Sequence, residues 1–321
     1  MLKDTMRFVV LVIAAVLMVL STVSAGTWRL ENGRDWESVS AEGKDKFFMA
    51  VAEVKKLVDT GKSKAASKAF DTLTKDFPEI AGPDLDVFIE AEMFYCKGQL
   101  TRAVRSYDKL LNEYPKSELC QAALDRQFAI ATAYLGGKKK VVLGFIKFKG
   151  YAEGIRIMEK ITNRVGLDTT MGIKASLAVA QNYEDRKKFN DAYIKWWEIS
   201  IQWETGPIGR DSLLGMARCK HAEYNKHPEH QRPFYDASSL KTAKSCYRKA
   251  MLIYPEEARE IGVDQILKEI DEQLAFKELS IGRYYQRVGN IQSANLYYDM
   301  VVNDWPGTEA AEMAKEILAE N

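Results

Sequence analysis

All three histidines of this 321-residue chain lie close together, and imidazole nitrogens are common ligands of zinc and related metal ions. The histidines and the neighbouring carboxylates are His221, His227, His230, Glu223, Glu229 and Asp236. A metal-dependent enzyme using His221, His227 and His230 is therefore one interpretation. However, their spacing matches no recognised metal motif, and a solvated loop beside a helix explains the same residues. We expect no metal ligand here.

Other residues that could carry out catalysis are not spaced for it. The sequence has no G-x-S-x-G elbow, Walker-type glycine loop or H-E-x-x-H motif, and no Cys and His at a recognised spacing. We therefore expect a protein that is not an enzyme and that binds no cofactor.

The four cysteines, Cys96, Cys120, Cys219 and Cys246, are widely spaced and form no C-x-x-C motif. Cys219 and Cys246 are expected on adjacent helices. In an exported protein they either form a disulfide or remain buried thiols, and the sequence favours neither.

A second candidate site is the segment 136–150 (GGKKKVVLGFIKFKG), which combines lysines with apolar residues and contains no acid. Lys138, Lys139, Lys140, Phe145 and Phe148 could contact a membrane surface or a protein partner. In a membrane contact, the lysines pair with anionic head groups while the apolar side chains insert into the lipid layer. The simpler interpretation is a long turn whose apolar residues pack on the rest of the protein while the lysines stay hydrated.

Adjacent aromatic residues supply a third set of candidates, because two neighbours on a helix cannot both face the same core. The pairs are Trp196–Trp197 and Tyr297–Tyr298. We expect Trp197 and Tyr297 to pack against a neighbouring element. The functional alternative is that they anchor a bound peptide, since Trp and Tyr are enriched at binding hot spots.

Helical hairpins must position these residues, because residues 91–115 and 282–306 repeat one pattern at equal offsets. The matching pairs are Ala91 and Gly282, Phe94 and Tyr285, Gly98 and Gly289, Ala103 and Ala294, Tyr107 and Tyr298, Leu110 and Val301, and Pro115 and Pro306. Small residues let two antiparallel helices approach closely. Glycine ends the first helix and proline prevents the second from continuing.

This pattern resembles the tetratricopeptide repeat, and degenerate copies surround Ala66, Ala131, Ala180 and Ala243. We expect an all-α, tetratricopeptide-type helical hairpin solenoid of about six repeats over residues 44–306, because isolated hairpins cannot bury their apolar faces. An amphipathic helix from Thr308 to Ala319 should cap the array. The segments 136–150 and 225–237 interrupt the third and fifth hairpins.

The first residues predict export. Lys3 and Arg7 precede an uncharged apolar run, Phe8–Leu20, and small residues follow up to Ala25. This order is typical of a secretory signal peptide, and the run is shorter than a membrane-spanning helix needs. An uncleaved anchor is the alternative. We therefore divide the chain into a signal peptide (1–25), an extended N-terminal arm (26–43) and the repeat solenoid (44–321).

The overall charge of the chain is nearly balanced, with a formal net charge of +1. Nucleic-acid-binding proteins usually carry an excess of Lys and Arg that neutralises phosphates. We therefore expect no nucleic acid among the partners.

The export signal, the Tyr-Pro-x-Ser and Trp-Pro-x-Thr junctions (residues 114–117 and 305–308) and the Gly-x-x-x-x-Ala-x-x-x-Tyr hairpins resemble the BamD family. Its members are periplasmic tetratricopeptide proteins of the outer-membrane β-barrel assembly machinery. The resemblance implies a periplasmic scaffold, associated with the outer membrane, that binds β-barrel assembly components. The family usually carries a lipid-bearing cysteine after the signal, whereas no cysteine precedes Cys96 here. The alternative is a generic exported adaptor in cell-envelope organisation or division.

Overall fold

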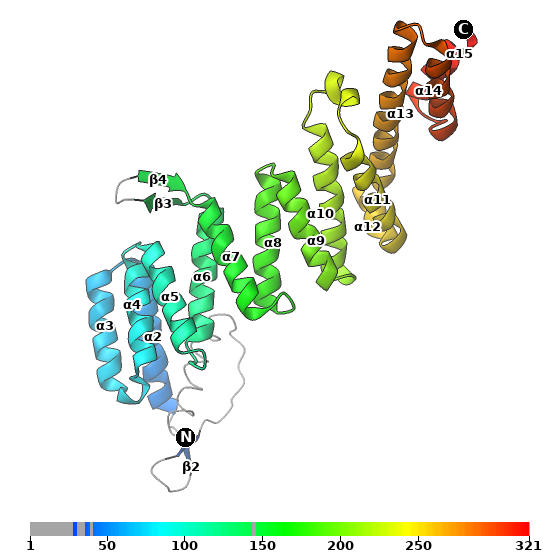
Figure 1. The fold of residues 1–321 in the computed structure, drawn as a ribbon. Coiled ribbons are helices and arrows are strands. Elements are labelled where there is room, and N and C mark those ends of the chain that lie inside the picture. Colours follow the sequence, from blue (N-terminus) through cyan, green and yellow to red (C-terminus); the bar gives the residue numbers. More distant parts are fainter. Residues whose placement is uncertain (1–27, 31–35, 39–40, 143–145, 321) are drawn as a thin grey trace. The chain divides into compact units, whose positions relative to one another are not determined.

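A computed structural model describes residues 28–30, 36–38, 41–142 and 146–320. This part of the chain consists mainly of α-helices, with two short antiparallel β-hairpins (Figure 1). It divides into two compact units, residues 1–161 and 162–321. The expected signal peptide, residues 1–25, lies outside the described residues, as does Phe145. No helix within them has both the length and the apolar content to cross a membrane.

The first unit contains the first two expected hairpins and the start of the third. Its elements are β1 (Trp28–Leu30), β2 (Trp36–Ser38), α2 (Ala41–Asp59), α3 (Ser63–Asp76), the 3-10 helix η1 (Pro78–Ile80), α4 (Pro83–Cys96), α5 (Leu100–Glu113), α6 (Cys120–Leu135), β3 (Lys139–Val142), β4 (Ile146–Lys149) and most of α7 (Tyr151–Val165). The expected N-terminal arm includes the β1–β2 hairpin, and α2 begins at Ala41, slightly earlier than expected.

The insertion in the third hairpin is a β-hairpin and not the long turn that we expected. Lys139 pairs with Lys149 and Lys140 with Phe148 in an antiparallel register. The two strands contact each other and pack extensively on no other described element. The hydrogen bonds between these strands are therefore local to the described part of the insertion.

The second unit contains the remaining hairpins. Its elements are α8 (Thr170–Asp185), α9 (Phe189–Gln202), α10 (Gly206–Asn225), the 3-10 helix η2 (Glu229–Phe234), α11 (Ser238–Ile253), α12 (Pro255–Ile261), α13 (Val263–Arg287), α14 (Ile291–Asp304) and α15 (Glu309–Glu320). The pairs α8–α9, α10–α11 and α13–α14 are the expected fourth to sixth hairpins, and α15 is the expected cap. The short α12 and the 25-residue length of α13 were not expected.

One structural rule recurs in three hairpins. The second helix carries a buried aromatic residue whose polar atom donates a hydrogen bond to the first helix. The pairs are Tyr107 with Glu92, Trp196 with Glu184 (3.1 Å) and Tyr298 with Gln286 (2.8 Å). Each aromatic side chain thus fills the helix crossing and also satisfies its own polar atom, as buried Tyr and Trp require. The expected all-α fold of tetratricopeptide-type hairpins is confirmed.

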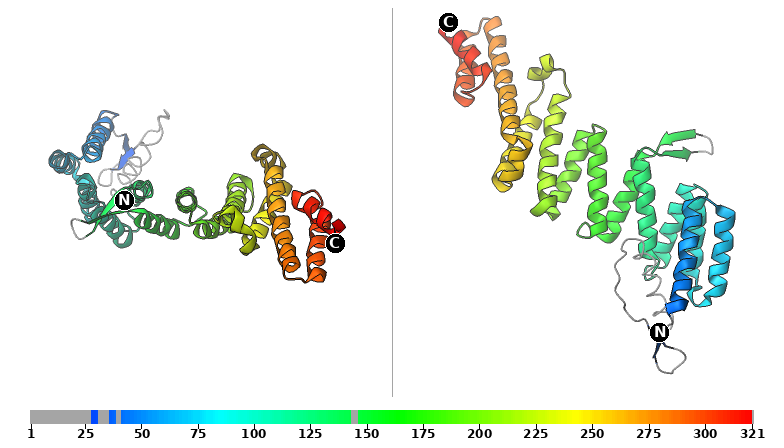
Figure 2. Two further views of the ribbon diagram at one scale, coloured as in Figure 1. Left: turned by 90° about the horizontal axis from the view of Figure 1, so that it is seen from above. Right: turned by 180° about the vertical axis from the view of Figure 1, so that it is seen from behind.

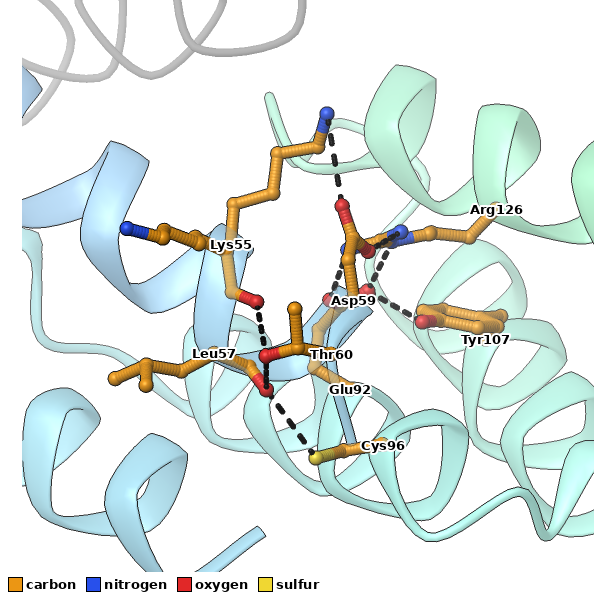
Figure 3. A network of polar contacts seen from close by, with 9 residues as sticks. Lys55, Leu57, Asp59, Thr60, Glu92, Cys96, Tyr107 and Arg126 are labelled. Atoms are coloured by element: carbon orange, nitrogen blue, oxygen red, sulfur yellow. Dashed lines mark hydrogen bonds and ion pairs between the residues drawn. The ribbon is translucent and has the colours of Figure 1, made fainter. Parts of the chain in front are cut away.

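A buried polar network links the helices of the first unit (Figure 3). The Arg126 guanidinium of α6 donates to both carboxylate oxygens of Glu92 in α4, at 2.8 and 2.7 Å, and to Asp59 at the end of α2, at 2.6 Å. Tyr107 of α5 donates to the same Glu92 carboxylate. Glu92 is only 3% exposed, so its charge depends on these partners.

Candidate partner-binding site

An open surface pocket of about 440 Å³ lies in the second unit. Its lining residues are Phe234, Ser280, Arg283, Gln286, Arg287 and Ile317. They come from η2, α13 and α15. In both views of Figure 2 the orange α13 lies beside the red C-terminal helices, and contacts of α13 with α14 and α15 agree with this.

Helix α13 supplies the polar wall of the pocket. Ser280, Arg283 and Arg287 follow one another at intervals of three and four residues, so they share one face of the helix. Gln286 lies beside them and accepts the hydrogen bond of the buried Tyr298 hydroxyl. The wall is therefore attached directly to the packed core of the α13–α14 hairpin.

Phe234 enters the pocket rim because α13 holds the insertion 225–237 in place. The Lys277 ammonium donates hydrogen bonds to the carbonyls of Pro233 and Tyr235, both at 2.8 Å. Phe234 lies between these two residues in the sequence, so its backbone is held in place while its side chain remains 76% exposed. A large aromatic side chain exposed to water can serve as a binding anchor.

The insertion is also ordered by its own contacts. The Tyr224 hydroxyl donates to the Arg232 carbonyl at 2.9 Å, and the Arg232 guanidinium donates to the His227 carbonyl at 3.0 Å. The rings of His227 and Tyr235 stack with their centroids 3.5 Å apart. These contacts restrict the loop before any partner binds, which lowers the entropy cost of binding.

The capping helix α15 is fixed at its first turn. The Glu272 carboxylate of α13 accepts hydrogen bonds from the backbone N–H groups of Glu309 (2.9 Å) and Ala310 (3.0 Å). Thr308 accepts a further one from Ala311 at 3.1 Å, as expected for a capping residue. Ile317, further along α15, is thereby held at the apolar rim.

The pocket is positively charged. Arg283 and Arg287 are exposed, and neither forms an ion pair within the part of the chain that the structure describes. Arg283 donates instead to the Met313 sulfur at 3.4 Å. No carboxylate is among the lining residues. Two guanidinium groups beside exposed apolar side chains favour a ligand that carries both a carboxylate and an apolar group.

Comparisons with known proteins agree with this architecture. Residues 213–321 match the family YfiO, described as an outer membrane lipoprotein, and residues 89–117 match the tetratricopeptide repeat. The chain is a tetratricopeptide repeat protein that resembles the BamD family. Tetratricopeptide arrays are protein-interaction modules, and the match to YfiO is consistent with a location in the cell envelope.

Two solved structures resemble the chain weakly and at low sequence identity. The C-terminal part of a tetratricopeptide repeat protein from Cytophaga hutchinsonii is 16% identical, with a TM-score of 0.38 over 98% of this chain and 96% of that one. PilW, a type IV pilus biogenesis factor, is 14% identical, with a TM-score of 0.29 over 84% and 97%. We draw no functional conclusion from either. No curated protein matches the chain in sequence.

The aromatic candidates from the sequence lie apart from this pocket's lining. Trp197 of α9 is 49% exposed, whereas its neighbour Trp196 is buried. Tyr297 of α14 is partly buried and stacks on Tyr285 of α13, with ring centroids 5.5 Å apart. Tyr297 thus contributes to packing within its own hairpin, and Trp197 stays a candidate anchor.

The lysine-rich candidates lie on or beside the β3–β4 hairpin of the first unit. Lys138 and Lys139 are exposed, and Lys140 forms an ion pair with Glu153 at 2.8 Å. Phe148 is 59% exposed, so it does not pack on the helices as we expected for a turn.

The three histidines do not converge. His221 lies in α10 edge-on to Tyr247, His227 stacks on Tyr235, and His230 contacts Gln231. Among the described residues, no group of three or more His, Cys, Asp or Glu side chains could hold a metal ion. The helix end at Asn225 separates His221 from the other two, so nearness in sequence does not become nearness of the rings.

A change of pH should reveal the burial of His221. Burial lowers the pKa of His221 from its ordinary value of 6.5, and the nearby Arg232 lowers it further, against an opposing effect of Glu269. The unfolded chain then binds a proton that the folded protein does not. The stability that neutral His221 provides is therefore present above about pH 6.5 and is lost as the pH falls below it. When the pH is lowered from about 7.5 to about 5.5, the free energy of unfolding of His221→Phe should fall less than that of the wild type.

Urea unfolding of both proteins at several pH values measures this difference. The difference between their unfolding free energies should shift in favour of the variant as the pH falls. Parallel curves for the two proteins would contradict a depressed pKa for His221.

The cysteines are free thiols in the structure. Cys219 and Cys246 are both buried, and no disulfide joins them. Burial, followed by the nearby Glu184, raises the pKa of Cys219 to about 12, so it is a thiol and not a reactive thiolate at neutral pH.

The pocket does not follow from residue spacing alone. Within the insertion 225–237 the histidines suggested a metal site, whereas Phe234 carries no motif of its own. The spacing of Arg283 and Arg287 on one helical face was available from the sequence. Their position beside Phe234, however, depends on Lys277. This lysine binds the carbonyls of Pro233 and Tyr235, which lie more than 40 residues earlier in the sequence.

Proposed function

We propose that this protein is a periplasmic, BamD-like scaffold that binds protein partners and takes part in the assembly of outer membrane proteins. The observation that supports it most is that every residue lining the pocket falls within residues 213–321, which match the outer membrane lipoprotein family. The segment that matches this family therefore also contains the proposed binding surface.

The chemistry of the pocket defines the kind of partner. Arg283 and Arg287 would pair with a carboxylate, and Phe234 and Ile317 would contact an apolar side chain next to it. Such a ligand is an acidic and apolar segment of another protein. The arrangement needs no reacting group, so we infer a binding role and not catalysis.

Site-specific cross-linking in intact cells tests the proposal. A photo-reactive phenylalanine analogue at Phe234 should capture a component of the β-barrel assembly machinery, identified by mass spectrometry. The same analogue at Leu252 is the matched control, because Leu252 lies in the same unit and is 83% exposed but does not line the pocket. Capture of a cell-division protein, or equal capture from both positions, would contradict the proposal.

Removal of one arginine provides a second control. With the analogue at Phe234, Arg283→Ser should lower the cross-linking yield by about tenfold if the guanidinium pairs with a carboxylate in a hot spot. Arg248→Ser removes another exposed arginine, from α11 outside the pocket, and should leave the yield unchanged. Equal yields from the two variants would contradict the role of Arg283.

A further inference from the structure

The β3–β4 hairpin is a basic arm with no counterpart in the expected repeat. The segment 138–149 contains five lysines, six aliphatic or aromatic residues and no acid. Figure 1 and the right-hand view of Figure 2 show it as an extension beside α6 and α7. Because the strands pack extensively on no other described element, the arm contributes little to the helical core.

The cross-strand pairing brings like charges together. Lys139 lies directly opposite Lys149, and such pairs destabilise a two-stranded hairpin, which is marginally stable in any case. Lys138, Lys139 and Lys149 are exposed, and none of them forms an ion pair with a described carboxylate. Lys149 instead lies over the Tyr151 ring, 5.6 Å from its centroid. An external anion would relieve this repulsion.

The nearest acid cannot neutralise the arm. Glu153 is bound by Lys140 at 2.8 Å and also by Arg156, so its single negative charge is shared between two cations. Phe148, directly opposite Lys140, remains exposed to water. The described part of the arm therefore combines a positive potential with an exposed aromatic ring.

We propose that this hairpin binds the surface of a membrane that contains anionic phospholipids. Lys139 and Lys149 lie directly opposite each other and share one face of the two-stranded hairpin, so their ammonium groups would contact the phosphates together. Lysines are compact charges that contact phosphates with little directional preference, whereas a carboxylate is better matched by the planar guanidinium group of arginine. The exposed lysines therefore favour a phosphate-bearing lipid surface over an acidic protein.

Vesicle co-sedimentation tests this inference on the full chain, with vesicles of phosphatidylcholine alone or with added phosphatidylglycerol. Wild-type protein should bind the anionic vesicles more tightly. Each lysine near the surface contributes about fivefold, so changing Lys138, Lys139 and Lys149 to serine should weaken anionic binding on the order of a hundredfold. Any binding by the apolar segment Phe8–Leu20 is common to all variants.

The matched control changes Lys62, Lys64 and Lys68 to serine, which removes the same charge from exposed positions at the start of α3 and just before it. It should bind anionic vesicles within about twofold of the wild type, since steering by distant charges is screened at physiological salt. Phe148→Ser changes the opposite face of the hairpin and should leave binding within about twofold of the wild type. Far-UV circular dichroism of all variants should match the wild type, because the arm lies outside the helical core.

Three results would overturn the proposal. One is equal binding of anionic and neutral vesicles by the wild type, and another is equal loss in the two triple variants. The third is a hairpin variant that retains vesicle binding but loses a cross-linked acidic protein, which would assign the arm to a protein partner.

Discussion

Replacing Glu92 by alanine should lower the free energy of unfolding of the first unit by about 3–5 kcal/mol, because it leaves the largely buried Arg126 charge without its principal partner. Both oxygens of Glu92 accept hydrogen bonds from Arg126, and the Tyr107 hydroxyl also donates to this carboxylate (Figure 3). Urea unfolding followed by circular dichroism measures the loss. Hydrogen exchange should locate it in α4, α5 and α6.

Two further variants separate the network from a general loss of packing. Asp59→Ala removes the more exposed partner of Arg126, whose ion pair is 2.6 Å long, and should cost only about 1 kcal/mol or less. Changing both Glu92 and Arg126 to leucine removes both charges, and it should recover much of the stability lost by Glu92→Ala, since apolar replacement of a buried pair is often nearly neutral. If the double variant were as unstable as Glu92→Ala, the lost stability would not come from an unpaired charge.

Replacing Gly282 by leucine should destabilise the α13–α14 hairpin by about 1–3 kcal/mol through overpacking. A Cβ atom at this position would lie 2.6 Å from Cε1 of Tyr298, and the Tyr298 side chain is fully buried. The tyrosine cannot move aside without giving up its hydrogen bond to Gln286. Urea unfolding followed by hydrogen exchange in α13 and α14 measures the loss at this hairpin.

The matched control is Gly307→Leu, because a Cβ atom there meets no other atom within 4 Å. It should change stability by about 0.5 kcal/mol or less. Tyr298→Ala alone should cost about 3–5 kcal/mol by leaving a cavity, and combining it with Gly282→Leu should cost less than the sum of the two. Strictly additive losses would show that the two residues do not share the crossing.

The proposed binding surfaces differ in the chemistry that they recognise. The pocket of the second unit presents guanidinium groups, which bind a carboxylate in a planar and directional way, beside an exposed aromatic ring. The hairpin of the first unit presents lysines, which are compact charges that contact phosphates with little directional preference. This difference is the reason for assigning a protein segment to the first surface and a lipid surface to the second.

The sequence by itself determined the helical hairpins. Small residues, aromatic residues, glycines and prolines at fixed offsets act within a few helical turns, so the pairs α4–α5 and α13–α14 follow from residues 91–115 and 282–306 alone. The capping role of Thr308 is equally local, since its hydroxyl accepts a hydrogen bond from a residue three positions later. These features depend on short-range geometry, which residue spacing encodes directly.

Only the tertiary structure decided the site. Lys277 brings Phe234 to the pocket by binding carbonyls more than 40 residues earlier, and Glu272 holds the helix that carries Ile317. The histidines are close in the sequence but do not share a site. His221 in α10 contacts Tyr247, whereas His227, after the end of α10, stacks on Tyr235. The contacts of Lys277 and Glu272 join segments that are far apart in the sequence. The spacing of residues within one segment therefore cannot predict which segments meet.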